Sequence, residues 1–304
     1  MSTIRKIKRV WKSRPTIEGA GVHLKRAFGN YQVPQLDPFL LLDDFRSDNP
    51  DHYLKGFPWH PHRGIETITY VLSGEVEHGD SMGNNGRISS GDVQWMTAGS
   101  GIIHQEMPKG DKKKSMLGFQ LWANLPAAHK MMDPRYRDVT SGQIPEITLK
   151  SGAKMKIICG KIDGEQGPVR DIITDPEYLD VTVPSGATFT HPVKRGRNVF
   201  AYVIEGEGYF DPGRDPYAHE AIGANYFDFH RNCLCGNETI VLYGNDGEVV
   251  VTPEKNGVRF LLVSGKPIGE PVAWYGPIVM NTQEELRVAF AEYQNGTFIK
   301  RGKF

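Results

Sequence analysis

Hydrophobic and polar residues alternate along this chain in short runs, and turn-forming residues interrupt each run after a few positions. The segment Glu66–Leu72 is rich in β-branched and aromatic residues, a Ser-Gly pair interrupts it, and a strand-like run resumes over Glu75–His78. Further turn signals follow at Asn84–Gly86 and Ser90–Asp92. Because turns recur at the spacing typical of sandwiches and barrels, the pattern predicts antiparallel β-structure.

One segment near the C-terminus instead has the spacing of a helix. Thr282 and Glu285 are placed as in a capping box, and apolar residues follow at i, i+3, i+4 and i+7 from Leu286 to Tyr293. The sequence therefore predicts one short C-terminal helix that packs through this apolar stripe.

A short sequence recurs in the two halves of the chain. Tyr70–Glu75 reads YVLSGE, Tyr202–Glu207 reads YVIEGE, and a His-Pro pair precedes each copy. The length of 304 residues is about twice that of a typical domain. We therefore predict a duplicated β-barrel with its join in the stretch Pro126–Pro145, giving domains at residues 1–135 and 136–304.

Composition and charge narrow the class of protein. The 36 Lys and Arg residues balance the 36 Asp and Glu residues, so the bulk positive charge needed for non-specific binding to nucleic acid or membrane surfaces is missing. The sequence has no run of about 18 apolar residues and no apolar signal-peptide core. Three cysteines do not suggest a disulfide framework. We expect a soluble, cytoplasmic protein with no direct nucleic-acid or membrane partner.

Histidines mark the candidate chemistry. His60 and His62 are spaced i, i+2, which places both imidazoles on one face of a strand. His104 and Glu106 have the same spacing, across the intervening hairpins. An isolated His-x-His pair is usually solvated or structural, but two pairs of potential ligands with the same i, i+2 spacing in a β context favour a metal site. Three imidazoles and a carboxylate suit Fe(II), Mn(II), Ni(II), Cu(II) or Zn(II) and leave open positions.

The spacing alone leaves the identity of the carboxylate open. Residues 60, 62, 64 and 66 share strand parity, so Glu66 could face the metal in place of Glu106.

Three longer motifs resemble the pirin family of bicupins, and they are Gly56–Thr67, Gly91–Pro108 and Gly276–Thr282. Pirin-like segments run from Leu36 to Asn281, so the resemblance covers nearly the whole chain. It implies an all-β fold of two cupin (jelly-roll) barrels packed face to face, followed by the short helix. It also implies one metal, usually iron, in the N-terminal barrel.

The resemblance assigns roles to the matching positions. The implied metal ligands are His60, His62, His104 and Glu106. Glu66 then becomes an outer-sphere or pocket-wall residue. When the two copies are aligned by their 132-residue offset, Pro192 and Lys194 stand where His60 and His62 do, so the second barrel is expected to lack the ligands.

The activity implied by the resemblance is that of a metal-dependent quercetin (flavonol) 2,3-dioxygenase. The metal, expected to be Fe(II), would lower the pKa of the flavonol 3-hydroxyl and Glu106 would accept its proton. The products expected from the flavonol and O₂ are a ring-opened depside and carbon monoxide. The residues expected to line the pocket are Phe57, Trp59, Glu66, Trp95 and Met96.

The family also includes proteins with a different role. The alternative is a non-catalytic, iron-binding regulator whose oxidation state controls binding to a transcription factor or a metabolic enzyme. A third possibility is a metal that only stabilises the barrel. The open coordination positions would serve no purpose in a metal that only stabilises the barrel.

Overall fold

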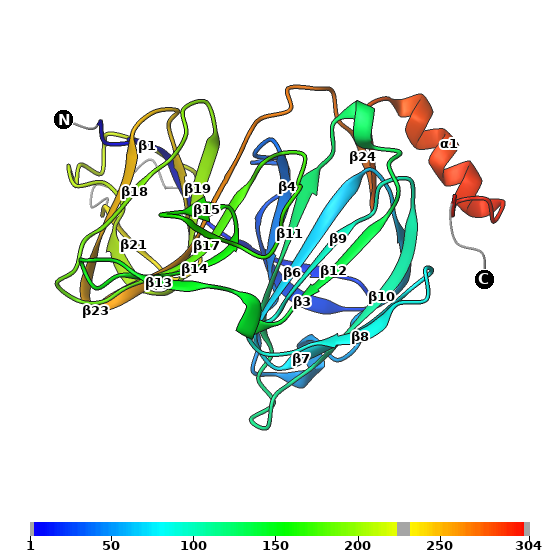
Figure 1. Ribbon diagram of the computed structural model, residues 1–304, viewed down its shortest axis with the longest axis horizontal. Helices are drawn as coiled ribbons and strands as arrows, with labels where there is room; N and C mark the ends of the chain where they lie inside the picture. The colour runs from blue at the N-terminus through cyan, green and yellow to red at the C-terminus, as the bar shows by residue number, and fades with distance from the viewer. Residues whose placement is uncertain (1–2, 224–231, 301–304) are drawn as a thin grey trace. The chain divides into compact units, whose positions relative to one another are not determined.

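The computed structural model describes residues 3–223 and 232–300 of the chain. These residues form mainly antiparallel β-sheets with one α-helix, so the predicted all-β class is confirmed (Figure 1). That helix is too short and too polar to cross a bilayer.

The chain divides into two compact units, and each combines two separate stretches of sequence. One unit, here called the first barrel, consists of Arg14–Gln143 and Ile268–Phe304. The other, the second barrel, consists of Met1–Ser13 and Ile144–Pro267. The predicted domains, 1–135 and 136–304, differ from these units because each end of the chain belongs to the barrel that is distant in sequence. Figure 1 shows the blue strand β1 (Ile7–Lys12) among the strands of the second barrel.

The first barrel is built from two antiparallel sheets. A seven-stranded sheet has the order β12-β9-β6-β11-β4-β3-β2, and a four-stranded sheet has the order β5-β10-β7-β8. The strand bounds are β2 (Arg14–Glu18), β3 (Val22–Phe28), β4 (Phe39–Asp44), β5 (Phe57–His62), β6 (Ile65–Ser73), β7 (Glu75–Asp80), β8 (Asn85–Ile88), β9 (Val93–Thr97), β10 (Ile102–Lys109), β11 (Leu117–Asn124) and β12 (Arg135–Val139).

The C-terminal stretch adds a hairpin and a helix to the first barrel. The hairpin pairs β24 (Ala273–Tyr275) with β25 (Ile278–Met280). Helix α1 (Gln283–Gln294) begins with the predicted capping box of Thr282 and Glu285, and buries Leu286 and Ala289.

Among the residues that the structure describes, the first barrel also contains short 3-10 helices at Pro50–His52, Ala127–His129 and Ser141–Gln143.

The second barrel contains a ten-stranded sheet, in which β1 pairs with β22 and β20. Its other strands are β13 (Glu146–Thr148), β14 (Lys154–Cys159), β17 (Glu177–Val183), β18 (Phe189–Pro192), β19 (Asn198–Tyr209), β20 (Glu220–Ala221), β21 (Leu234–Gly236), β22 (Thr239–Tyr243) and β23 (Glu248–Gly265). A separate hairpin pairs β15 (Lys161–Ile162) with β16 (Glu165–Gln166).

Strand β18 is the segment that the internal repeat aligns with β5. There Pro192 is paired with Glu248, and Lys194 lies beyond the strand with an exposed side chain. Within residues 3–223 and 232–300, the group of histidine, cysteine or acidic side chains with a geometry able to hold a metal lies in the first barrel.

A fully buried arginine anchors the N-terminal segment to the second barrel. The Arg5 guanidinium donates hydrogen bonds to backbone carbonyls, and these belong to Val193, Lys194, Arg197, Gly244 and Gly247. We expect Arg5→Met to lower the free energy of unfolding by about 2 kcal/mol, because buried acceptors lose their donor. Urea unfolding followed by circular dichroism measures this, with Lys6→Met as the control because the Lys6 side chain is 67% exposed. A loss no larger than that of Lys6→Met would contradict the expectation.

Candidate metal centre and cavity

Three histidines from two paired strands of the first barrel converge on one point. In the antiparallel pairing of β5 with β10, His104 lies opposite His60, and His62 follows on the same face of β5. The Nε2 atom of His60 lies 3.0 Å from Nε2 of His62 and 3.0 Å from Nε2 of His104. The two predicted i, i+2 pairs therefore bring three imidazoles together, and this group could hold a metal.

Backbone carbonyls fix which nitrogen of each β5 histidine carries hydrogen. The Nδ1 atom of His60 lies 2.8 Å from the carbonyl oxygen of Pro58, and Nδ1 of His62 lies 3.0 Å from that of Pro277. A carbonyl oxygen only accepts, so each Nδ1 is the donor, and an imidazole with a single ring proton then presents a bare Nε2.

Two bare nitrogens facing one another repel unless a cation lies between them. Nitrogens bound at about 2.1 Å from a metal, in adjacent positions of an octahedron, would be about 3.0 Å apart. The observed separation of 3.0 Å between Nε2 of His60 and that of each neighbour fits this value. The donor set therefore matches a first-row divalent metal.

The protonation of the cluster also favours a metal. Burial, followed by the neighbouring His60 imidazole, lowers the pKa of His62 well below its usual value. Burial and then the His62 and His60 imidazoles do the same for the pKa of His104. Both rings are therefore neutral near pH 7, which is the form that binds metals.

Glu106 lies in the barrel interior on the same strand as His104, but both of its carboxylate oxygens are hydrogen-bonded to protein. Oε1 accepts from Oγ1 of Thr69 at 2.9 Å, and Oε2 accepts from Nε2 of Gln120 at 2.9 Å. The indole N–H of Trp122 donates to Oε1 of Gln120 at 3.1 Å, which fixes the amide orientation. Glu106 is not part of the converging group that the described residues form.

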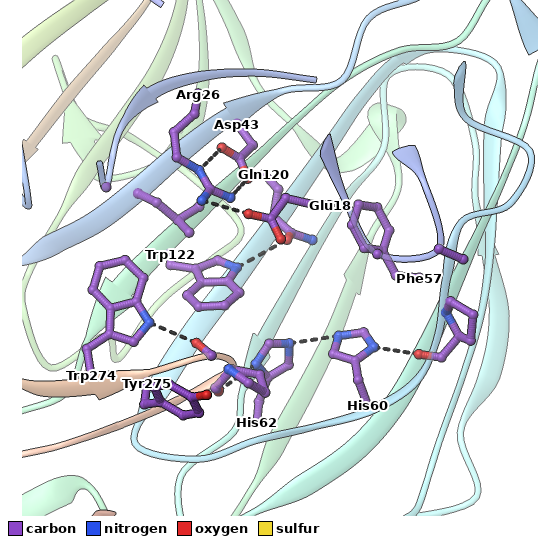
Figure 2. Close-up of a pocket in the computed structure, with 17 residues that line it drawn as sticks. Glu18, Arg26, Asp43, Phe57, His60, His62, Gln120, Trp122, Trp274 and Tyr275 are labelled. Carbon is purple, nitrogen blue, oxygen red and sulfur yellow. Dashed lines mark hydrogen bonds and ion pairs between the residues drawn. The ribbon is translucent and has the colours of Figure 1, made fainter. Parts of the chain in front are cut away.

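A cavity of about 700 Å³ opens beside His60 and His62, and all of its lining residues belong to the first barrel (Figure 2). Its volume is in the range of small-molecule sites. Aromatic side chains form much of the wall, and they are Phe57, Trp122, Trp274 and Tyr275. Figure 2 shows Trp274 and Tyr275 on one side of the cavity and Phe57 on the other.

A charged cluster lines the side of the cavity opposite the histidines (Figure 2). Arg26 forms a two-pronged ion pair with Asp43, at 2.8 and 2.7 Å, and its Nη1 lies 2.8 Å from Oε1 of Glu18. Burial alone would lower the pKa of Arg26, but the hydrogen bonds and charges of these carboxylates outweigh it and raise the pKa. The guanidinium therefore stays charged.

Of the five residues predicted to line the pocket, Phe57 lines this cavity and the other four do not. Trp59 is 53% exposed and lies outside it. Trp95 is buried in β9, and Met96 packs in a core cluster with Ile65. Trp95 and Met96 are therefore residues of the barrel core.

Glu66 also lies away from the histidines, because the chain turns between β5 and β6. Gly64 has a φ of +77°, so the strand parity that links His62 to residue 66 is lost there. Glu66 is fully buried, accepts a hydrogen bond of 2.6 Å from Thr97, and lies on the opposite face of β6 from Thr69. Burial raises the pKa of its carboxyl group.

Several residues that line the cavity were not predicted from the sequence. Gln120 and Trp122 have the i, i+2 spacing that places two side chains on one face of a strand, so the sequence could have indicated that they lie together. The C-terminal hairpin contributes Trp274, Tyr275 and Pro277 to the cavity. The pirin-like motif at Gly276–Thr282 marked this segment, but it did not indicate that the segment lines the cavity.

Comparison with known proteins shows the family. Residues 21–123 match the family model for pirin, and residues 178–299 match that for the pirin C-terminal cupin domain. A pirin-like protein of Caulobacter vibrioides is 41% identical over 97% of this chain and 99% of its own length. A pirin-like protein of Solanum lycopersicum is 40% identical over 93% of this chain and 89% of its own.

A crystal structure of a quercetin 2,3-dioxygenase from Acinetobacter baumannii superposes with a TM-score of 0.83. It is 28% identical and covers 97% of this chain and 99% of that one. The two barrels, the histidine cluster in the first of them and these matches along the sequence agree, and the chain belongs to the pirin family of two-cupin proteins.

Proposed function

We propose that this protein is a dioxygenase that opens the heterocyclic ring of flavonols such as quercetin, with Fe(II) held by His60, His62, His104 and Glu106. The observation that carries the proposal is the convergence of three Nε2 atoms beside a cavity with aromatic walls. The similarity to a quercetin 2,3-dioxygenase supports the choice of reaction. When bound, the metal would supply Lewis acidity toward the substrate hydroxyl and the redox chemistry that O₂ requires.

The protein residues would position the substrate and move its proton. Glu106 would accept the proton of the flavonol 3-hydroxyl. Thr69 and Gln120 hold its carboxylate in one orientation, at 2.9 Å each, and Gln120 also lines the cavity. Each oxygen keeps a second lone pair that can take up the proton, and Gln120 would couple the carboxylate to the bound substrate.

The aromatic walls would bind the planar ring system and exclude water. Trp122 packs edge-on against His62, with ring centroids 5.0 Å apart, and so brings an apolar face next to the histidines. Trp274 extends this apolar face, and its ring centroid lies 6.1 Å from that of Trp122. Aromatic surfaces at these positions favour a flat aromatic substrate.

The test is the consumption of quercetin by protein reconstituted with Fe(II) without oxygen and then exposed to O₂. The flavonol absorbance should fall while carbon monoxide is released. Glu106→Gln should slow this reaction about 100-fold, because the amide cannot accept the proton. Gln105→Ala is the matched control, since Gln105 precedes Glu106 on β10 and alternation directs it to the other face.

Two outcomes would contradict the proposed dioxygenase function. One is an iron-loaded protein that leaves quercetin unchanged. The other is a reaction that proceeds at the same rate in Glu106→Gln, Gln105→Ala and the unsubstituted protein.

A further inference from the structure

The charged side of the cavity contains more acceptors than donors. Arg26 is the cation of this cluster, and it faces two carboxylates, Asp43 and Glu18. The Asp43 side chain is 7% exposed and uses both oxygens on Arg26. Glu18 is 41% exposed, and its Oε1 lies 2.8 Å from Nη1 of Arg26.

This arrangement selects the chemistry of a ligand at that end. Two carboxylates already offset the positive charge of Arg26, which leaves little attraction for an anionic group. The cluster carries one net negative charge, which repels carboxylates and phosphates. The partly exposed carboxylate of Glu18 lines the cavity and accepts hydrogen bonds, so it favours neutral groups that donate, such as phenolic hydroxyls.

We propose that Glu18 binds the hydroxyl groups on the pendant aryl ring of a flavonol and thereby selects substrates hydroxylated and uncharged at that ring. This inference rests on the proposed function, because it takes the 3-hydroxyl end of the substrate to lie at the histidines. Figure 2 shows Glu18 and the histidines on opposite sides of the cavity, with Trp122 at a level between them. Asp43 and Arg26 act as positioning residues, because the ion pair fixes the guanidinium that orients Glu18.

The experiment compares flavonols that differ only at the pendant ring. Quercetin has two hydroxyls on that ring, whereas galangin has none and keeps the same fused rings. Dissociation constants are measured by titration calorimetry on the Fe(II)-loaded protein without oxygen, so that binding is separated from turnover. Glu18→Gln should raise the constant for quercetin about 10-fold, since a hydrogen bond to a charged acceptor is lost, and change that for galangin less than about 2-fold.

A negatively charged ligand tests whether the electrostatic potential at the Glu18 end of the cavity is negative. 3-Hydroxyflavone with a carboxylate at the 4′ position should bind the unsubstituted protein at least about 10-fold more weakly than 3-hydroxyflavone, and Glu18→Gln should narrow that gap. Glu18→Asp keeps the charge and should restore part of the preference for quercetin. Glu77→Gln is the matched control, because it removes a carboxylate paired with Lys109 in the same barrel but outside the cavity.

The outcomes separate this inference from the proposed function. Equal weakening of quercetin and galangin by Glu18→Gln, or no change for either, would overturn the role of Glu18 while flavonol cleavage still stands. A protein that binds neither flavonol would overturn both proposals.

Discussion

Replacing His104 by alanine should lower the affinity for Fe(II) roughly 100- to 1000-fold, because the free energy of a four-ligand site of about 10–16 kcal/mol is shared among its donors. His104 is 1% exposed, and its Nε2 lies 3.0 Å from that of His60. A water molecule filling the space would be a weaker donor than the neutral imidazole that it replaces. Anaerobic titration of the metal-free protein, with elemental analysis of the product, measures the loss.

Thermal unfolding provides a second readout of the same change. A metal that binds only the native state stabilises it by about 2.7 kcal/mol when its concentration is 100 times the dissociation constant. The metal-dependent rise in Tm should therefore be large in the unsubstituted protein and nearly absent in His104→Ala. His23→Ala is the control, because His23 is an exposed histidine of the same barrel that stacks on His52. One tightly bound metal in His104→Ala would exclude the proposed centre.

The histidine cluster could be predicted because it depends on strand geometry alone. An i, i+2 pair on a strand places both side chains on one face whatever surrounds it, and His60 and His62 do so. The capping box of α1 was predictable for the same reason, since Thr282 and Glu285 interact locally. Such features need no knowledge of distant contacts.

The failures arise where distant residues decide the local geometry. Gly64 turns the chain between β5 and β6, and a Cβ there would lie 1.9 Å from the carbonyl oxygen of Val279. This close approach to the C-terminal hairpin is not visible in the sequence, so strand parity alone left Glu66 open as a metal ligand although it lies away from the histidines. Two further features also depend on contacts between residues far apart in the sequence. They are the cavity wall at Trp274 and the pairing of β1 with β22 in the second barrel.

A local competition displaced one predicted turn. The sequence Asn84–Gly86 favours a hairpin turn, but β8 begins at Asn85 and the turn lies before it. There the Asp80 carboxylate accepts the backbone N–H groups of Met82 and Asn84. Gly83, with a φ of +89°, supplies the left-handed position that Gly86 was expected to provide.

The second large effect concerns Lys130, a lysine that is 1% exposed in the first barrel. Its Nζ donates to the carbonyl oxygens of Gly64 and Val279, at 2.9 and 3.0 Å, and to Oδ1 of Asn124 at 2.7 Å. It thus joins the turn that follows His62 to the C-terminal hairpin. We expect Lys130→Met, which keeps a long side chain but no donor, to lower the free energy of unfolding by about 3 kcal/mol at pH 7.

The loss should grow as the pH rises. Burial lowers the pKa of Lys130 from 10.5 to about 8, so between these values the unfolded state binds more protons than the folded state. The contribution of Lys130 to stability therefore increases with pH across this window, by about 2 kcal/mol between pH 8 and 9.5. Below about pH 8 both states are protonated, and the cost of burying the charge applies in full.

Urea unfolding at pH 7.5 and pH 9.5 tests both parts of this expectation. The difference in unfolding free energy between the unsubstituted protein and Lys130→Met should be larger at pH 9.5, whereas Lys112→Met, at an exposed lysine, should change little at either pH. Comparing the variant with the unsubstituted protein removes the ionisation of tyrosines, which both share. A difference that stays constant over this range would show that the Lys130 ammonium keeps an ordinary pKa, because its three oxygen acceptors would then compensate fully for burial.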